Sequence, residues 1–179
     1  MTEFLTDVAT LRDRARAHMD LGSVTDAYGA DRARVVDVLN EALATELVCI
    51  LRYKRHYFTA QGLNAQTAAT EFLQHATEEQ SHADMIAARI TQLRGKPDFD
   101  PDTLSMRSHA EYDASDDLGD ILREDLVAER VAVASYSVVI AWIGAGDPTT
   151  RRMLEEILAV EEEHAEDMLT LLEGLEAGA

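Results

Sequence analysis

The chain has 179 residues, of which 34 are acidic and 16 are basic, so its formal net charge at pH 7 is −18. This length fits one domain, and an apolar fraction of 46% is sufficient for a folded core. A surface with this much negative charge repels phosphate groups. The charge therefore excludes nonspecific binding to nucleic acid or anionic membranes through a basic patch. Nine glycines, three prolines and 6% aromatic residues favour helices over an all-β fold.

The expected compartment is the cytoplasm. Cys49 is the single cysteine, so no intramolecular disulfide can form, and a reducing compartment fits. Residues 1–20 are charged and lack the apolar segment of a secretory signal. The uncharged run at 131–146 is short for a bilayer span. We therefore predict a soluble protein with no membrane partner.

Glycine and proline mark the expected helices in the first half of the chain. A charged helix is predicted over 3–20, and residues 1–30 form an N-terminal helix and linker ahead of a main domain at 31–176. One long helix is expected from 31 to 61, a break at 62–64, and a second long helix ending at Gly95. Gly95 is expected in the left-handed position that ends a helix, with Pro97 preventing continuation.

The second half repeats this arrangement after a long connection. Residues 96–115 are predicted to be a loop with one helical turn near 104–110, and a third helix covers 116–143. Asp147 is the expected N-cap of a fourth helix, with Pro148 as its first residue and its end near 174. Short breaks within each half indicate antiparallel hairpins. The prediction is an all-α four-helix bundle with a long crossover between its second and third helices.

Each long helix carries one glutamate in its apolar seam. Apolar residues recur at steps of three and four, and these positions face the bundle axis. An isolated buried carboxylate is costly, and four at one level repel each other. The glutamates that stand in these apolar seams are Glu46, Glu79, Glu129 and Glu161. Positive charge is therefore expected between these four carboxylates.

Histidines complete the predicted site. His82 and His164 each follow a seam glutamate by three residues and so share its helix face. The two halves repeat the plan, because 33 residues separate Glu46 from Glu79 and 32 separate Glu129 from Glu161. This is the arrangement of di-iron and di-manganese carboxylate bundles. The predicted metal-binding and catalytic residues are Glu46, Glu79, His82, Glu129, Glu161 and His164.

Other interpretations account for single residues better than for the set. One seam glutamate alone fits a salt bridge to a neighbour such as Arg130, and one histidine alone fits a core residue bonded to a carbonyl. Burying all six without cations is electrostatically unfavourable. Oxygen-rich ligands with one imidazole per ion favour iron or manganese over structural zinc.

These motifs resemble those of bacterioferritin-type ferritins, in the same order along residues 36–172. The matching segments are Leu39-Asn-Glu-Ala-Leu-Ala-Thr-Glu46-Leu, Tyr53, Glu79-Gln-Ser-His82-Ala-Asp, Leu126-Val-Ala-Glu129 and Glu161-Glu-Glu-His164. The resemblance implies a ferritin-like fold, in which Glu46 with His82 holds one iron and Glu129 with His164 the other. Glu79 and Glu161 would bridge the two irons. Tyr53 would lie near the metals, although it fits a plain core aromatic equally well.

Three departures from the resemblance shape the expected assembly and cofactors. Gln80 stands where haem-binding bacterioferritins have methionine, so haem is not predicted. The chain ends soon after His164, without room for the fifth helix of 24-subunit shells, and its N-terminal helix resembles Dps-like smaller cages. Twelve subunits are therefore favoured over 24. Ordinary Dps proteins use a site between subunits and often a lysine-rich tail for DNA, whereas Lys54 and Lys96 are the only lysines here.

The predicted function is iron storage and detoxification by a ferroxidase that oxidises Fe(II) with O2 or H2O2 and stores the mineral in an oligomeric shell. A manganese catalase or another small di-metal oxidase is the alternative, followed by a non-enzymatic interaction bundle. His75 is either an extra iron ligand or a hydrogen-bonded polar residue. The uncharged run at 131–143 is expected to pack against another subunit. Spare carboxylates are expected to guide cations or to form a solvated face, namely Glu78, Asp84, Glu162, Glu163 and Glu166.

Overall fold

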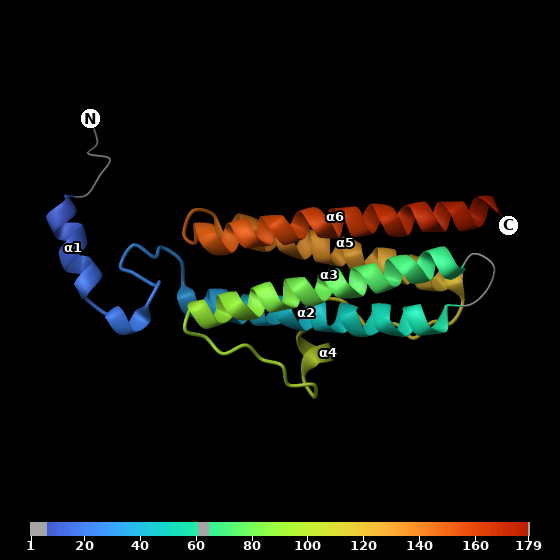
Figure 1. Ribbon diagram of the computed structural model, residues 1–179, viewed down its shortest axis with the longest axis horizontal. Helices are drawn as coiled ribbons and strands as arrows, with labels where there is room; N and C mark the ends of the chain where they lie inside the picture. The colour runs from blue at the N-terminus through green and yellow to red at the C-terminus, as the bar shows by residue number, and fades with distance from the viewer. Residues whose placement is uncertain (1–6, 61–64, 179) are drawn as a thin grey trace.

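Four long helices lie side by side and form the body of the molecule (Figure 1). The structure is a computed structural model that describes residues 7–60 and 65–178, and within these ranges it contains no β-strand. The bundle consists of α2 (Arg32–Thr59), α3 (Ala65–Gln92), α5 (Leu118–Ile143) and α6 (Pro148–Ala177). The all-α four-helix bundle predicted from the sequence is confirmed.

Aspartates begin three of the four bundle helices. Asp31 accepts a hydrogen bond from the backbone N–H of Arg34, and Asp117 caps α5 in the same way. Asp147 accepts from the N–H of Thr150 at 2.9 Å, and Pro148 is the first residue of α6. These side chains satisfy N–H groups that have no partner inside the helix. The predicted start of the last helix is therefore confirmed.

The connections give the bundle its crossover. Gly144–Asp147 join α5 and α6 in a tight hairpin, whereas the predicted break at 62–64 lies outside the described residues. Residues 93–117 run along α2 from one end of the bundle to the other (Figure 1). This crossover contains α4 (Leu104–Arg107), which is shorter than the predicted turn at 104–110. The long crossover between the second and third bundle helices is confirmed.

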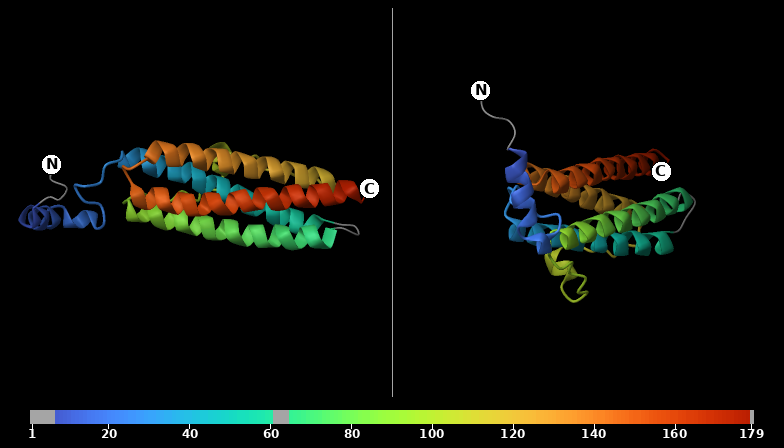
Figure 2. Two further views of the ribbon diagram at one scale, coloured as in Figure 1. Left: turned by 90° about the horizontal axis from the view of Figure 1, so that it is seen from above. Right: turned by 60° about the vertical axis from the view of Figure 1, so that its left-hand side comes forward.

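The N-terminal segment lies beyond one end of the bundle (Figure 2). It contains α1 (Val8–Arg16) and a 3₁₀ turn at Met19–Leu21, so the single helix predicted over 3–20 is wrong within the described residues. Ala17 is extended and His18 has a left-handed backbone with φ 51°, which interrupts the helix. No residue of α1 is buried, so packing does not extend the helix past this point.

The glutamate layer lies between the two larger clusters of the apolar core. Twelve buried residues on one side and seven on the other form separate clusters. Val35 and Ala132 are buried in this core, whereas the neighbouring Val36 and Val133 are half-buried.

The end of α3 differs from the prediction in one residue. Arg94, and not Gly95, has the left-handed backbone, with φ 63°. Gly95 is needed for a different reason, since a Cβ there would lie 2.6 Å and 2.8 Å from the two γ-methyl carbons of Val36. The glycine therefore permits close approach of the crossover to α2.

Helix α5 is apolar on more than its core side. Val138 and Trp142 are 69% and 49% exposed in the single chain. Leu118–Ile143 is also long and apolar enough to cross a membrane by length and composition, a test that core helices of soluble proteins pass as well. Here α5 carries the buried acids Asp125 and Glu129 and packs against α6. The exposed apolar side chains of α5 are consistent with the expected packing against another subunit, which stays a prediction.

Candidate metal centre

The six predicted site residues meet in one buried layer halfway along the bundle. Each of the four glutamates is 1% exposed, and His82 and His164 are 5% and 1% exposed. Glu46 comes from α2 and Glu129 from α5, whereas α3 and α6 each supply a Glu-x-x-His pair. The helical repeat places the two members of each pair on the same face, one turn apart.

Two groups of possible ligands overlap within this layer. One group contains Glu46, Glu79, His82 and Glu161, and the other contains Glu79, Glu129, Glu161 and His164. In each group, one ligand atom per residue lies within 4.8 Å of all the others. Glu79 and Glu161 belong to both groups, as expected for side chains that bridge two ions.

Both imidazole rings direct Nδ1 into the layer. His82 Nδ1 lies 2.9 Å from Glu161 Oε1 and 3.4 Å from Glu46 Oε2. His164 Nδ1 lies 3.8 Å from oxygens of Glu79 and Glu161 and 3.9 Å from Glu129. Two imidazoles therefore present the same ring nitrogen to two adjacent sets of carboxylates.

Several buried polar atoms in the layer lack a hydrogen-bond partner among the described residues. They include Glu46 Oε2, Glu79 Oε1, Glu129 Oε2 and His164 Nδ1. Because unpaired buried polar atoms are costly, such a concentration in one place requires a reason. All four atoms belong to groups that donate lone pairs to cations, and the set of oxygen ligands with one imidazole per ion fits iron or manganese.

In the absence of a cation, burial and mutual repulsion favour the protonated form of three of the four carboxylates. Burial, followed by the charges of Glu161 and Glu46, raises the pKa of Glu79 well above its usual range. Burial and Glu161 raise the pKa of Glu129 in the same way, and the pKa of Glu161 is also raised. Burial opposes ionisation of Glu46 too, but the neighbouring Glu79 and His82 side chains lower its pKa overall. Protons thus take the place of positive charge between the carboxylates.

The two histidines titrate in opposite directions. Burial lowers the pKa of His82, but its bonds to Glu161 and Glu46 outweigh this effect and raise the pKa to about 10. Burial and the neighbouring positive charge of His82 lower the pKa of His164 to about 4. The metal-free layer therefore contains one imidazolium and one neutral imidazole at neutral pH.

Two tyrosines support the layer, of which only Tyr53 was predicted to lie near it. Tyr53 on α2 donates a hydrogen bond to Glu129 Oε1, and Tyr136 on α5 donates one to Glu46 Oε1. Burial raises the pKa of both hydroxyls well above the usual range, so they stay protonated and donate. The sequence contains a pattern that could have predicted the position of Tyr136, because each tyrosine follows the glutamate of its own helix by seven residues.

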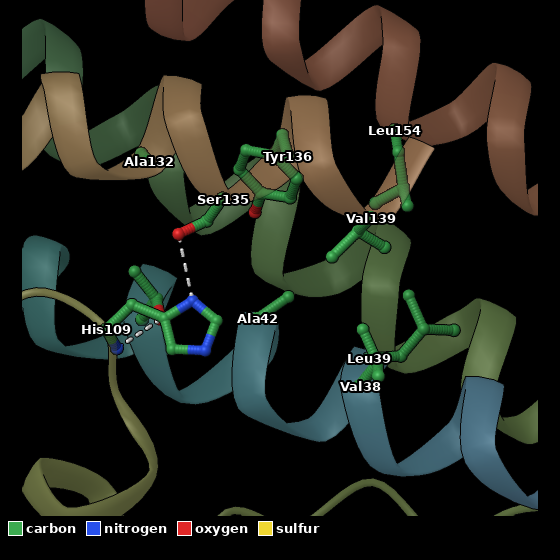
Figure 3. A pocket seen from close by; sticks show the side chains of 10 residues that line it. Val38, Leu39, Ala42, His109, Ala132, Ser135, Tyr136, Val139 and Leu154 are labelled. Carbon is green, nitrogen blue, oxygen red and sulfur yellow. Dashed lines mark hydrogen bonds between the residues drawn. The ribbon is translucent and has the colours of Figure 1, made fainter. Parts of the chain in front are cut away.

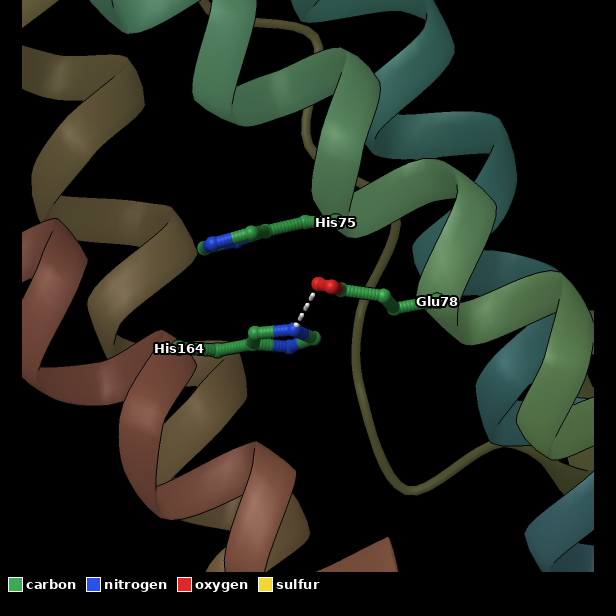
Figure 4. Close-up of side chains that lie close together, drawn as sticks. All are labelled: His75, Glu78 and His164. Atoms are coloured by element: carbon green, nitrogen blue, oxygen red, sulfur yellow. Dashed lines mark hydrogen bonds and ion pairs between the residues drawn. The ribbon is translucent and has the colours of Figure 1, made fainter.

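A polar face on α3 and α6 adjoins the layer (Figure 4). His164 Nε2 lies 2.8 Å from Glu78 Oε2. Since an ionised carboxylate only accepts hydrogen bonds, Nε2 carries the hydrogen and Nδ1 presents its lone pair to the layer. His75 stacks on His164 with ring centroids 3.8 Å apart, and its Nε2 lies 3.4 Å from Asp167. His75 is thus a partner of a site histidine and of an acid.

Buried ion pairs next to the layer involve different residues from those expected. Arg130 is exposed, so the alternative of a salt bridge from this arginine to a buried seam glutamate is wrong. Arg52 instead pairs with Asp125 at 3.0 Å, and Asp125 also contacts His56 at 2.9 Å. Arg52 donates to the carbonyl of Glu111 at 2.6 Å as well, which attaches the crossover to the bundle.

A four-helix bundle with one crossover and a layer of four glutamates and two Glu-x-x-His histidines is the architecture of ferritin-like carboxylate proteins. Comparison with known families agrees. The model of the ferritin family, described as a ferritin-like domain, matches residues 36–177. The chain belongs to the ferritin family.

Relatives of this chain include proteins named bacterioferritin and proteins named for DNA protection. The chain is 27% identical to a bacterioferritin of Desulfovibrio desulfuricans over 134 residues, which are 74% of this chain and 71% of the relative. It is 28% identical to the DNA protection during starvation protein of Halobacterium salinarum over 164 residues, covering 89% and 90% of the two chains. A solved structure, the bacterioferritin-related dodecameric thioferritin of Bacteroides fragilis, superposes with a TM-score of 0.80 at 30% identity, covering 83% of this chain and 90% of that one.

Proposed function

We propose that the protein is a ferroxidase that oxidises Fe(II) and stores the product as Fe(III) mineral in an oligomeric shell in the cytoplasm. The observation that carries the proposal is the pair of overlapping ligand groups that share Glu79 and Glu161 in a buried layer. Membership in the ferritin family and similarity to bacterioferritins support it. Iron enters as substrate, and manganese fits the same ligands.

In the proposed reaction, two Fe(II) ions each lose one electron. One O2 accepts both electrons and two protons and becomes H2O2, or one H2O2 accepts both electrons and two protons and becomes two molecules of water. Glu46 with His82 and Glu129 with His164 would each hold one ion, and Glu79 and Glu161 would hold both together. Tyr53 and Tyr136 would fix the terminal carboxylates, because each donates to one oxygen and leaves the other toward the ions.

The acidic side chains beside the layer favour the storage function over a closed oxidase. Glu71, His75 and Asp167 form a further group within 4.8 Å of one another on the α3–α6 face, next to Glu78. Burial, Asp167 and Glu78 raise the pKa of Glu71, which reflects crowding of negative charge. Such a face attracts cations and offers a path between solvent and the layer.

The proposed assembly is a homo-oligomeric cage of twelve subunits without haem, and the structural relative from Bacteroides fragilis is described as dodecameric. We propose no nucleic-acid partner, although one relative is named for DNA protection. The reason is charge, since the chain carries −18 and residues 1–34 combine five arginines with six acids. A DNA mobility-shift assay at low salt tests this, and retarded DNA would contradict the proposal.

Aerobic addition of Fe(II) in increasing amounts tests the function. The proposal predicts rapid oxidation at two ions per chain, followed by continued uptake into particles that stay soluble. Disproportionation of H2O2 by the manganese-loaded protein, without net iron uptake, would instead establish the catalase alternative. An oxidation rate no faster than that of Fe(II) in buffer would contradict both and leave an interaction bundle.

A further inference from the structure

An apolar cavity lies between α2 and α5, close to the carboxylate layer (Figure 3). It has room for one small molecule. Ala132 in its wall is three residues from Glu129, which is about one helical turn. The other lining residues include Leu39, Ala42, Val139 and Leu154. Apolar side chains therefore enclose a small space near the six site residues.

The wall nearest the layer is formed by Tyr136. Its hydroxyl donates to Glu46 Oε1, so a single side chain links the cavity to a terminal carboxylate of the proposed centre. Thr45, the residue before Glu46, lines the cavity as well. Tyr136 thus connects the cavity wall directly to the layer.

His109 of the crossover covers the outer side of the cavity. Its backbone N–H donates to Thr45 Oγ1 at 3.0 Å, and its ring Nδ1 hydrogen bonds with Ser135 Oγ at 3.1 Å (Figure 3). These bonds attach the crossover to both α2 and α5. The His109 side chain is 35% exposed, and Val38, Ala42, Ser135 and Val139 in the cavity lining are also partly exposed, so this side of the cavity lies close to solvent.

The two faces of the bundle offer different environments. Contacts between α2 and α5 and between α3 and α6 place the cavity and the acidic residues Glu78 and Asp167 on opposite faces. A cation, or the hydrogen-bonding molecule H2O2, loses hydration in an apolar cavity without compensation. Small apolar gases, in contrast, occupy dry apolar cavities. The cavity therefore suits dioxygen better than either of the other two substrates.

We propose that this cavity binds dioxygen and is its route from the crossover face to the carboxylate layer. The inference rests on the proposed ferroxidase function, in which O2 takes one electron from each of two Fe(II) ions and two protons. Fe(II) reaches the layer from the α3–α6 face, and dioxygen arrives from the α2–α5 face.

Filling the cavity tests this route. Ala42→Leu adds three carbons to the wall, and Ser135→Leu adds bulk at the outer side. Ala87→Leu is the matched control, because Ala42 and Ala87 are both partly buried against the same core cluster but Ala87 does not line the cavity. We expect both cavity variants to slow Fe(II) oxidation at limiting O2 by about tenfold, to recover as O2 rises, and to retain the wild-type rate with H2O2.

Xenon provides a readout that does not depend on iron. In the metal-free wild type, dissolved xenon should shift the methyl NMR signals of Leu39, Val139 and Leu154, and Ala42→Leu should abolish these shifts. Unchanged O2 dependence in both cavity variants, or equal slowing with both oxidants, would overturn the route. A wild-type protein that oxidises Fe(II) with neither oxidant would instead overturn the proposed function, so the two failures are distinguishable.

Discussion

Tyr53 and Tyr136 are related by the repeat that relates the two halves of the bundle. Each follows a glutamate of its own helix by seven residues, yet each donates to the glutamate of the other helix. The two hydrogen bonds thereby join α2 and α5 across the layer. They also fix which oxygen of Glu46 and Glu129 remains without a partner among the described residues.

Removal of either hydroxyl should have similar effects. We expect Tyr53→Phe and Tyr136→Phe each to lower the free energy of unfolding of the metal-free protein by about 1–3 kcal/mol, because a buried carboxylate oxygen loses its donor. Fe(II) oxidation should slow in both variants. Chemical denaturation and stopped-flow absorbance measure the two effects, with Tyr57→Phe, a half-buried tyrosine of α2, as control. Wild-type stability in both variants would contradict these roles.

Metal binding should release protons, and the affinity of the layer for metal should therefore rise with pH. Bonds to Glu161 and Glu46 raise the pKa of His82 from 6.5 to about 10, so the stability that this imidazolium contributes is complete below pH 6.5 and is lost as the pH rises through 10. A metal ion must displace that proton and those on the carboxylates. Calorimetric titration in two buffers of different ionisation enthalpy measures the release. Identical heats in both buffers would contradict it.

The six site residues were predictable because their spacing repeats in both halves and because buried acids need a counter-charge. Their metal binding remains a proposal. The bond of Tyr136 to Glu46 and that of Glu78 to His164 were not predicted. A sequence pattern places a residue on a helix face, but its partner depends on how neighbouring helices pack.

At the scale of elements, caps and breaks predicted the bundle helices closely. The prediction for α1 was wrong because it relied on the absence of glycine and proline before Gly22, whereas no residue of α1 is buried to stabilise the extra turns. Gly95 was predicted as the left-handed residue, but Arg94 has that conformation, and Gly95 makes room for Val36. Close approach between segments distant in sequence cannot be inferred from local pattern.

Two glycine substitutions should have opposite effects. Gly95→Ala should lower the free energy of unfolding by about 1–3 kcal/mol, because its Cβ would overlap the Val36 methyl groups. Gly174→Ala, within α6, should raise it by about 0.5–1 kcal/mol, because outside the adjoining helix backbone no described atom lies within 4 Å of the added Cβ. Thermal or chemical denaturation of both variants measures the contrast. Destabilisation of equal size in the two would contradict the role of Gly95.

At the scale of the whole molecule, the exposed apolar side of α5 should lie in an interface between subunits. Trp142→Glu combined with Val138→Glu should yield smaller particles in size-exclusion chromatography with light scattering, because an added charge at a buried interface is costly. Thr170→Glu, an exposed position on α6, is the control for added charge. An unchanged particle mass in the double variant would show that this face is not an interface.

The central claim is that the buried layer of four glutamates and two histidines binds two metal ions. Anaerobic titration with Fe(II), followed by calorimetry, tests it most directly in the wild type, in Glu79→Gln and in Glu162→Gln. Glu79 belongs to both ligand groups, whereas Glu162 is exposed one residue after Glu161. We expect two tightly bound ions per chain in the wild type and in Glu162→Gln, and loss of tight binding in Glu79→Gln with the helical fold retained. Equal binding by Glu79→Gln and the wild type, or no tight binding by the wild type, would contradict the claim.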